Sequence, residues 1–333
     1  MNQSDRSTFP ILILGLGRSG STVLCEVLNA HSRIHISDES WLFYRAARDL
    51  VDMGWKPRLR SRSGKQPPPF VKAGSDLGLR RAGPILLGEV PIDVDASVAK
   101  AAWRDWLHTI YSFLANRHHA ARYGDKCPGA APFADTIDDI LDEHCLYLWT
   151  VRHPIDLVLS WIERWRDPAV LRDVLSRVHD VSQFRPTRGD AIRAVLQAYL
   201  VHTVHLRRLL SECPSRVLVC PYEKLVAEPD RLLSEVHAFL GESLEKDQIA
   251  QAFSGRRQVS GGDPKFNQTD RIHGQSIDRW KRLSQPELAP YLEAVEEFRI
   301  LECMNFLGYT DAAAELSQAL GQPLTPKEAG VRS

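Results

Sequence analysis

A glycine-rich turn between an apolar run and a helical pattern constrains this chain most. Residues 11–14 (ILIL) have the character of a short buried strand, and the segment GLGRSGST that follows leads directly into an apolar pattern of helical period over residues 23–28. At such a junction the free backbone N–H groups of the helix start, together with the positive end of the helix dipole, favour an anion. The sequence therefore predicts a phosphate-type ligand at residues 15–22, and the alternative is a glycine turn with a purely structural role.

Two phosphate-binding templates fit this turn, and the first is a dinucleotide fingerprint. Gly15, Gly17 and Gly20 match G-x-G-x-x-G, and Asp38 and Glu39 stand about where an acid that binds the ribose would be expected, ~20 residues further on. An NAD(P)-dependent oxidoreductase, with Glu39 on the ribose, is therefore one reading of the turn.

The second template is the phosphate loop of nucleotide triphosphatases. The chain has Ser21 where that loop has its lysine and Thr22 at the final hydroxyl position. Because the lysine is needed on the β- and γ-phosphates, ATP or GTP hydrolysis is not expected. Arg18 and the hydroxyls of Ser19, Ser21 and Thr22 still suit a terminal oxyanion, which a guanidinium grips with two hydrogen bonds.

A second anion site is predicted further along the chain. Residues 145–151 (CLYLWTV) have the composition of a buried parallel strand, and Arg152 follows directly. Residues 155–166 then have helical period, with Ser160 and Arg164 four apart on one face. We expect Arg152, Ser160 and Arg164 to lie together at this strand-to-helix junction.

Composition excludes several classes of function. Of the 333 residues, Lys+Arg and Asp+Glu count 42 each, so no net charge favours nucleic acid or an anionic membrane. No apolar run is long enough to span a membrane, and the six cysteines form no C-x-x-C, so we expect a soluble cytoplasmic protein with reduced thiols. His202 and His205 lack a third nearby ligand, and no metal site is predicted.

The remaining pattern alternates strands and helices. A helix is expected over residues 96–121. It would place Trp103, Trp106, Ile110 and Leu114 on one face, and we interpret this face as packed against the core. We further expect strands at residues 34–36 and 216–220, and helices at residues 40–50, 168–182, 189–213, 225–240, 276–283 and 286–306.

One long stretch, residues 51–95, lacks periodicity. A basic cluster precedes three consecutive prolines, several glycines follow, and we interpret the stretch as an insertion or lid on the acceptor side. The chain then divides into a single domain over residues 1–310 and a frayed tail over residues 311–333.

These two junctions resemble those of a known family. The segment GLGRSGST at residues 15–22, and RHP at residues 152–154 with Ser160 eight residues after the arginine, resemble the 5′-phosphosulfate loop and the 3′-phosphate motif of PAPS-dependent sulfotransferases. The similarity is to the branch that includes tyrosylprotein sulfotransferases and many bacterial sulfotransferases. Gly17 replaces the usual proline before Arg18, and Ser21 replaces the usual threonine; both replacements keep the chemistry of the loop. The resemblance implies a phosphate-loop α/β fold of three layers, a central parallel sheet flanked by helices.

The resemblance also implies catalytic residues. Without a gap from Arg18, Glu39 falls on that branch's catalytic glutamate. Without a gap from Arg152, Lys126 falls on its active-site lysine, although a surface position is the default for a lysine before a turn. Glu39 would act as general base, while Lys126 and Arg18 would stabilise the sulfuryl and leaving-phosphate oxygens.

Residues that would bind the co-substrate follow from the same motifs. Tyr222 resembles a tyrosine of the family's V-x-Y-E-x-L stretch, and Arg279 stands where a lysine is often found, with Arg271 as an alternative contact. The expected set is Gly17, Arg18, Ser19, Gly20, Ser21, Thr22, Arg152, Ser160, Arg164, Tyr222 and Arg279.

The implied function is transfer of the sulfuryl group from PAPS to a hydroxyl or phenol, giving a sulfate ester and PAP without a metal. Two separated anion sites fit PAPS better than NAD, which has no 3′-phosphate. The alternatives are the oxidoreductase and a non-catalytic nucleotide-binding protein. The acceptor expected is a small molecule, a carbohydrate or a lipid headgroup.

Overall fold

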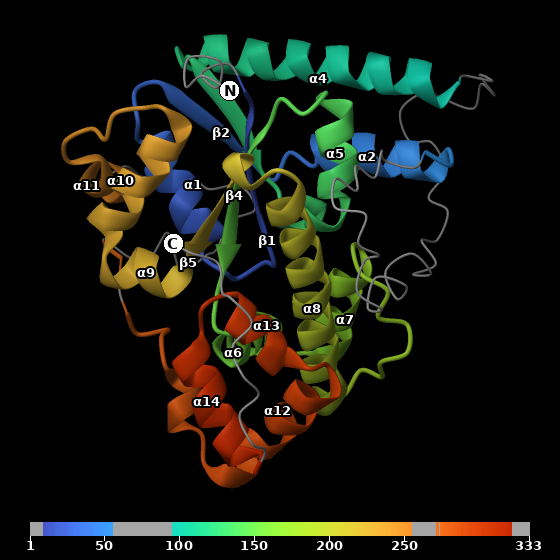
Figure 1. Ribbon diagram of the computed structural model, residues 1–333, viewed down its shortest axis with the longest axis vertical. Coiled ribbons are helices and arrows are strands. Elements are labelled where there is room, and N and C mark those ends of the chain that lie inside the picture. Colours follow the sequence, from blue (N-terminus) through green and yellow to red (C-terminus); the bar gives the residue numbers. More distant parts are fainter. Residues whose placement is uncertain (1–8, 56–94, 255–270, 273, 322–333) are drawn as a thin grey trace.

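Five parallel strands form the centre of the computed structural model, which describes residues 9–55, 95–254, 271–272 and 274–321 (Figure 1). The strand order is β2-β3-β1-β4-β5, and every neighbouring pair is parallel. The strands are β1 Ile11–Gly15, β2 Ile34–Asp38, β3 Arg122–Lys126, β4 Leu146–Val151 and β5 Val217–Pro221. Because all strands run the same way, their carboxyl ends meet at one edge, where open α/β sheets bind ligands.

Helices cover both faces of the sheet, so the predicted three-layer α/β fold is confirmed. Side chains of β1 alternate between two cores: Ile11 and Ile13 join one cluster, and Leu12 and Leu14 join the other. Helices α1, α10 and α11 lie on the first face, and α2, α5, α7 and α8 on the second, whereas α6 and α12 to α14 gather beyond the carboxyl edge (Figure 1).

The helices have the following bounds. They are α1 Ser21–Asn29, α2 Leu42–Asp52, α4 Ala96–Arg117, α5 Ala134–Ile140, α6 Pro154–Arg164, α7 Pro168–Ser176, α8 Arg188–Glu212, α9 Tyr222–Ala227, α10 Pro229–Leu240, α11 Gln248–Ser254, α12 Gln285–Glu297, α13 Ile300–Phe306 and α14 Thr310–Ala319, with 3-10 turns η3 Pro128–Phe133, η4 Pro214–Arg216 and η6 Arg279–Arg282. Within the part of the chain described, no helix is long and apolar enough to cross a membrane.

Strand β3 was not expected from the sequence. Its residues RYGDK contain little apolar character, yet all five are buried between β2 and β1. Gly124 permits this close pairing, because a Cβ there would lie 2.0 Å from the carbonyl oxygen of Ile11. The strand brings Lys126 to the carboxyl edge.

Two other expectations need correction. In α4 the fully buried residues are Leu107, Tyr111 and Ala115; Trp103 and Leu114 of the expected face are partly buried against the core, whereas Trp106 is exposed. The chain after Tyr309 is not frayed where it is described, since α14 buries Leu316 in the main core. Residues 56–94 and 322–333, which hold most of the expected insertion and tail, lie outside the described residues.

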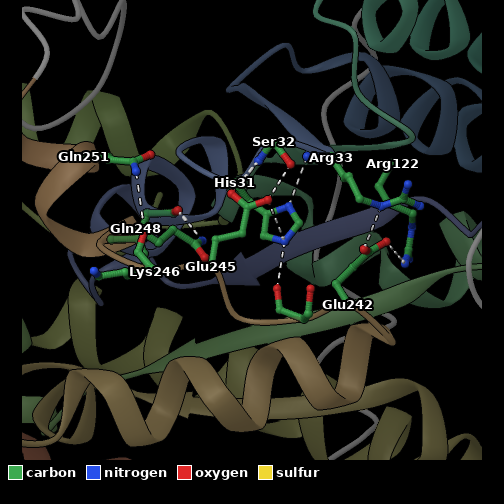
Figure 2. A network of polar contacts seen from close by, with 11 residues as sticks. His31, Ser32, Arg33, Arg122, Glu242, Glu245, Lys246, Gln248 and Gln251 are labelled. Carbon is green, nitrogen blue, oxygen red and sulfur yellow. Dashed lines mark hydrogen bonds and ion pairs between the residues drawn. The ribbon is translucent and has the colours of Figure 1, made fainter.

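A polar network joins the segments at the opposite, amino edge of the sheet (Figure 2). Arg122, fully buried at the start of β3, donates to the carbonyl oxygens of Leu240 (2.8 Å) and Phe9 (3.2 Å) and pairs with Glu242 at 3.6 Å. Glu242 also pairs with the exposed Arg33 at 3.0 Å. The network therefore ties β3 to the chain that follows α10.

Replacing the two arginines of this network should have unequal effects. Arg122→Met strands two buried carbonyls and a carboxylate, so we expect a loss of about 3–5 kcal/mol in the free energy of unfolding. Arg33→Ala removes only the exposed partner of Glu242, which keeps its pair with Arg122, so the expected loss is below about 1 kcal/mol. Denaturant titration of both variants measures the difference, and equal losses would show that burial does not determine the role of Arg122.

Candidate functional site

The turn between β1 and α1 has a backbone that glycine makes possible. Gly15 has φ +128°, and a Cβ there would lie 2.3 Å from the carbonyl oxygen of Thr150. Gly20 has φ +92°, and its Cβ would lie 2.6 Å from the ring of Tyr222. Helix α1 then begins at Ser21 with no side-chain cap, which leaves its first backbone N–H groups available to an anion.

Neighbouring side chains fix this turn in place. The buried hydroxyl of Ser19 lies 2.6 Å from the carbonyl oxygen of Leu16 and 2.6 Å from Oγ1 of Thr150 on β4. Trp161 of α6 donates its indole N–H to the carbonyl oxygen of Gly17 at 2.7 Å. The Ser19 hydroxyl thus has a structural role in the turn, while Thr22 is half-buried in the first turn of α1.

The structure brings the two predicted anion sites into contact. Arg18, with φ +74°, extends from the turn and donates its Nε to Oγ of Ser160 at 3.2 Å. Arg152, at the end of β4, donates from Nη1 to the carbonyl oxygen of Arg18 at 3.1 Å. Its guanidinium lies 4.5 Å from the ring centroid of Tyr222. Arg18, Arg152, Ser160 and Tyr222 therefore form one cluster, which we call the basic cluster.

Arg152 is held more tightly than the sequence suggested. Its side chain is buried, its Nη2 donates to the carbonyl oxygen of Ser276 at 2.6 Å, and its buried Nε has no partner among the described residues. Burial lowers the pKa of Arg152, although Tyr222 opposes this, and a guanidinium remains charged at any physiological pH.

The other predicted arginines have partners of their own. Arg164 ends α6, is exposed, and lies 5.5 Å from the ring centroid of Trp165. Arg279 pairs with Glu163 at 2.9 Å, and Arg271 is exposed. A role for any of the three on a ligand stays a prediction.

Lys126 is buried at the carboxyl end of β3 and does not lie at the surface, which is the usual position of a lysine before a turn. Its ammonium pairs with Oε1 of Glu39 at 2.8 Å and with the carboxylate of Asp38. Burial acts against the charged form, but Glu39 and Asp38 outweigh it and raise the pKa of Lys126. Lys126 is therefore an ammonium, and we call these three residues the buried ion triad.

Glu39 occupies an unusual backbone position in this triad. Its φ is +53°, and its N–H donates to the carbonyl oxygen of Lys126 at 2.8 Å. The carboxylate is partly exposed, unlike the buried ammonium that it contacts. The triad therefore presents one accessible carboxylate next to one fixed positive charge.

Sequence reasoning missed several residues that shape the site. The sequence suggests Asp38 as a ribose ligand or as the cap of the next helix, and it does not indicate that Asp38 and Glu39 share Lys126. Asp125 is fully buried next to Lys126, and burial raises its pKa to about 7. The other missed contacts are those of Ser40, Thr150, Trp161 and Ser276. The sequence offers one signal for these contacts, which is that the acid Asp125 directly precedes Lys126.

The fold and the turn define an α/β protein with a glycine-rich turn between β1 and α1 at the carboxyl edge of its parallel sheet. The model of the sulfotransferase family matches residues 10–246. This is more than half of the chain, and the protein belongs to the sulfotransferase family.

Solved structures agree with this fold. The sulfotransferase domain of the Synechococcus PCC 7002 olefin synthase is 21% identical, with a TM-score of 0.53, and the match covers 88% of this chain and 96% of that one. The sulfotransferase domain from the curacin biosynthetic pathway is 19% identical, with a TM-score of 0.52, over 96% and 99% of the two chains. No curated protein matched in a sequence comparison.

The raised pKa of Asp125 predicts a pH-dependent stability. Its carboxyl titrates near 7 in the folded protein and near 3.9 when unfolded, so the folded state holds a proton that the unfolded state has lost. This contribution is present at low pH and disappears as the pH rises through 7. We expect it to remove about 2 kcal/mol from the free energy of unfolding between pH 5 and pH 8.

Asp125→Asn provides the comparison, because an amide does not titrate. The difference in unfolding free energy between wild type and variant, measured by urea titration at several pH values, should change in favour of the variant as the pH rises. A difference that stays constant from pH 5 to pH 8 would contradict the assignment.

Proposed function

We propose that the protein transfers the sulfuryl group of PAPS to a hydroxyl or phenol of an acceptor, with Glu39 as general base. Membership of the sulfotransferase family supports sulfuryl transfer. The observation that carries the finer proposal is that the basic cluster and the buried ion triad both lie at the carboxyl edge of the sheet, where the neighbouring strands β3, β1 and β4 end. One edge of the sheet thus offers fixed positive charges and an accessible carboxylate.

The donor groups fit the two anionic ends of PAPS. Residues 15–22, with the uncapped start of α1 and Arg18, would hold the 5′-phosphosulfate. Arg152 and Ser160 would hold the 3′-phosphate, for which the unpartnered Nε of Arg152 supplies a donor. The Arg152 bond to the Ser276 carbonyl would have to be shared or exchanged. Arg164, Tyr222 and Arg279 complete the proposed set.

The ion triad suits the chemistry of an in-line transfer. As the acceptor oxygen bonds to sulfur, the bond from sulfur to the bridging phosphate oxygen breaks, and Glu39 accepts the acceptor's proton while PAP carries away the electron pair. Lys126 stabilises the negative charge on the transferring and leaving oxygens. Asp38 remains paired with Lys126 when Glu39 becomes neutral, so the ammonium stays anchored.

We propose a small-molecule, carbohydrate or lipid hydroxyl as acceptor and the cytoplasm as location. All six cysteines are buried free thiols, which supports a reducing compartment. The single domain over residues 1–310, with its acceptor-side insertion at residues 51–95, remains part of this proposal.

Calorimetric titration with PAP tests the two-anion site. The wild-type protein should bind PAP, and its affinity for NAD⁺ and for ATP should be much lower than its affinity for PAP. Arg152→Ala should weaken PAP binding about 10- to 100-fold, because it removes charge-assisted hydrogen bonds to a phosphate. Arg231→Ala, which changes an exposed arginine on α10, is the matched control and should bind like wild type. NAD⁺ binding that survives Arg152→Ala, with no PAP binding, would support the oxidoreductase instead.

Glu39→Gln tests the general base. The amide keeps the shape of the side chain but cannot take a proton, so kcat should fall about 10²- to 10⁴-fold while PAP affinity stays near the wild-type value. The rate is measured as the formation of PAP from PAPS in the presence of each of a panel of alcohols and phenols, with PAP quantified by chromatography. A variant with wild-type turnover would remove Glu39 from this role, and PAP binding without turnover in wild type would indicate a binding protein.

A further inference from the structure

The segment that carries Glu39 has a strained backbone. Glu39 and Trp41 both have positive φ, 53° and 62°, within three consecutive residues between β2 and α2. For non-glycine residues each such conformation costs on the order of 1–3 kcal/mol and persists only where its surroundings impose it. Contacts of residues 39–41 with the rest of the protein therefore have to maintain this turn.

Asp125 makes such contacts from the fully buried interior of β3. Its Oδ1 accepts the backbone N–H of Ser40 at 3.2 Å, and its Oδ2 accepts the Ser40 hydroxyl at 2.7 Å. The hydroxyl of Tyr111 on α4 lies 2.8 Å from the Ser40 hydroxyl. One buried carboxyl group therefore fixes both the backbone and the side chain of Ser40.

Strand β3 makes a second set of contacts with the same turn through Lys126. Neighbouring residues of a strand point to opposite faces of the sheet, so Asp125 and Lys126 approach the turn from different sides. The Lys126 ammonium contacts Glu39, and its carbonyl oxygen accepts the Glu39 N–H at 2.8 Å. Two adjacent residues of one short strand thus determine where the Glu39 carboxylate lies.

We propose that Asp125 is a positioning residue, which holds Ser40 and thereby fixes the Glu39 carboxylate beside Lys126. This inference rests on the proposed function of Glu39. Asp125 would touch neither acceptor nor PAPS, and it acts through the backbone of the turn. Titratable groups around it are Lys126 and Cys127 in its own segment, Tyr111 on α4 and Cys25 on α1.

Activity of three variants tests the coupling. Asp125→Ala and Ser40→Ala should each lower kcat about 10- to 100-fold, because a small displacement of a reacting group has effects of that size, while KM for PAPS stays unchanged. The double variant should lose no more than Asp125→Ala alone, since the two residues act through one contact. In a Glu39→Gln background, Asp125→Ala should have no further effect on kcat.

Asp138→Asn is the matched control. This acid on α5 accepts from Arg216 at 2.9 Å and from Tyr147 at 3.0 Å near the starts of β4 and β5, at the opposite edge of the sheet. It tests for loss of activity through general destabilisation, and we expect its kcat to remain near wild type. Ser40→Ala keeps the test open if Asp125→Ala does not fold.

Hydrogen exchange gives a readout that does not depend on turnover. The Ser40 amide, followed by mass spectrometry of peptides spanning residues 38–42, should exchange at least about tenfold faster in Asp125→Ala than in wild type or Asp138→Asn. Asp125→Asn, which keeps an oxygen for this amide, should retain most of the protection.

The outcomes separate the two proposals. Additive losses in the double variant, unchanged exchange at Ser40, or a loss that persists in the Glu39→Gln background would each overturn the positioning role. If wild type transfers no sulfuryl group to any acceptor, the proposed function fails, and the exchange measurement still decides whether Asp125 holds the turn.

Discussion

The burial of one ammonium group organises the carboxyl edge of this sheet. Lys126 is removed from water at the end of β3, and a buried charge of this kind is tolerated only with close partners. Both partners, Asp38 and Glu39, come from the end of the neighbouring strand β2. The buried ammonium of Lys126 therefore requires that β2 pairs with β3. In turn, the ion pairs of this ammonium fix the conformation of the chain directly after β2.

Parallel pairing extends this local arrangement into a site. Strand β1 lies between β3 and β4, so the glycine turn after β1 is flanked by Lys126 on one side and Arg152 on the other. Arg18 then crosses from the turn to Ser160 on α6. Residues far apart in the sequence become neighbours because three strand ends share one edge, which is how open α/β folds assemble a binding site.

Strong local patterns explain which parts of the structure could be predicted. The apolar runs of β1 and β4, and the glycine-rich turn that follows β1, can be recognised from composition alone. The positions of Arg18 and Arg152 at the ends of these strands follow from them. Strand β3 could not be predicted, because RYGDK has no alternation of apolar and polar residues. Its burial depends on the close contact of Gly124 with Ile11. The Asp125 contact with Ser40 depends on two left-handed residues, and no local pattern predicts such residues when they are not glycine.

The Ser19 hydroxyl has a consequence for recognition. Because it is bonded to Leu16 and Thr150 within the protein, the turn needs no ligand to acquire its shape. When the turn is already ordered, the binding free energy of a ligand does not have to offset the entropy cost of ordering eight residues. More of the electrostatic attraction between ligand and turn then contributes to affinity. The shape of the turn is thus preorganised by bonds within the protein.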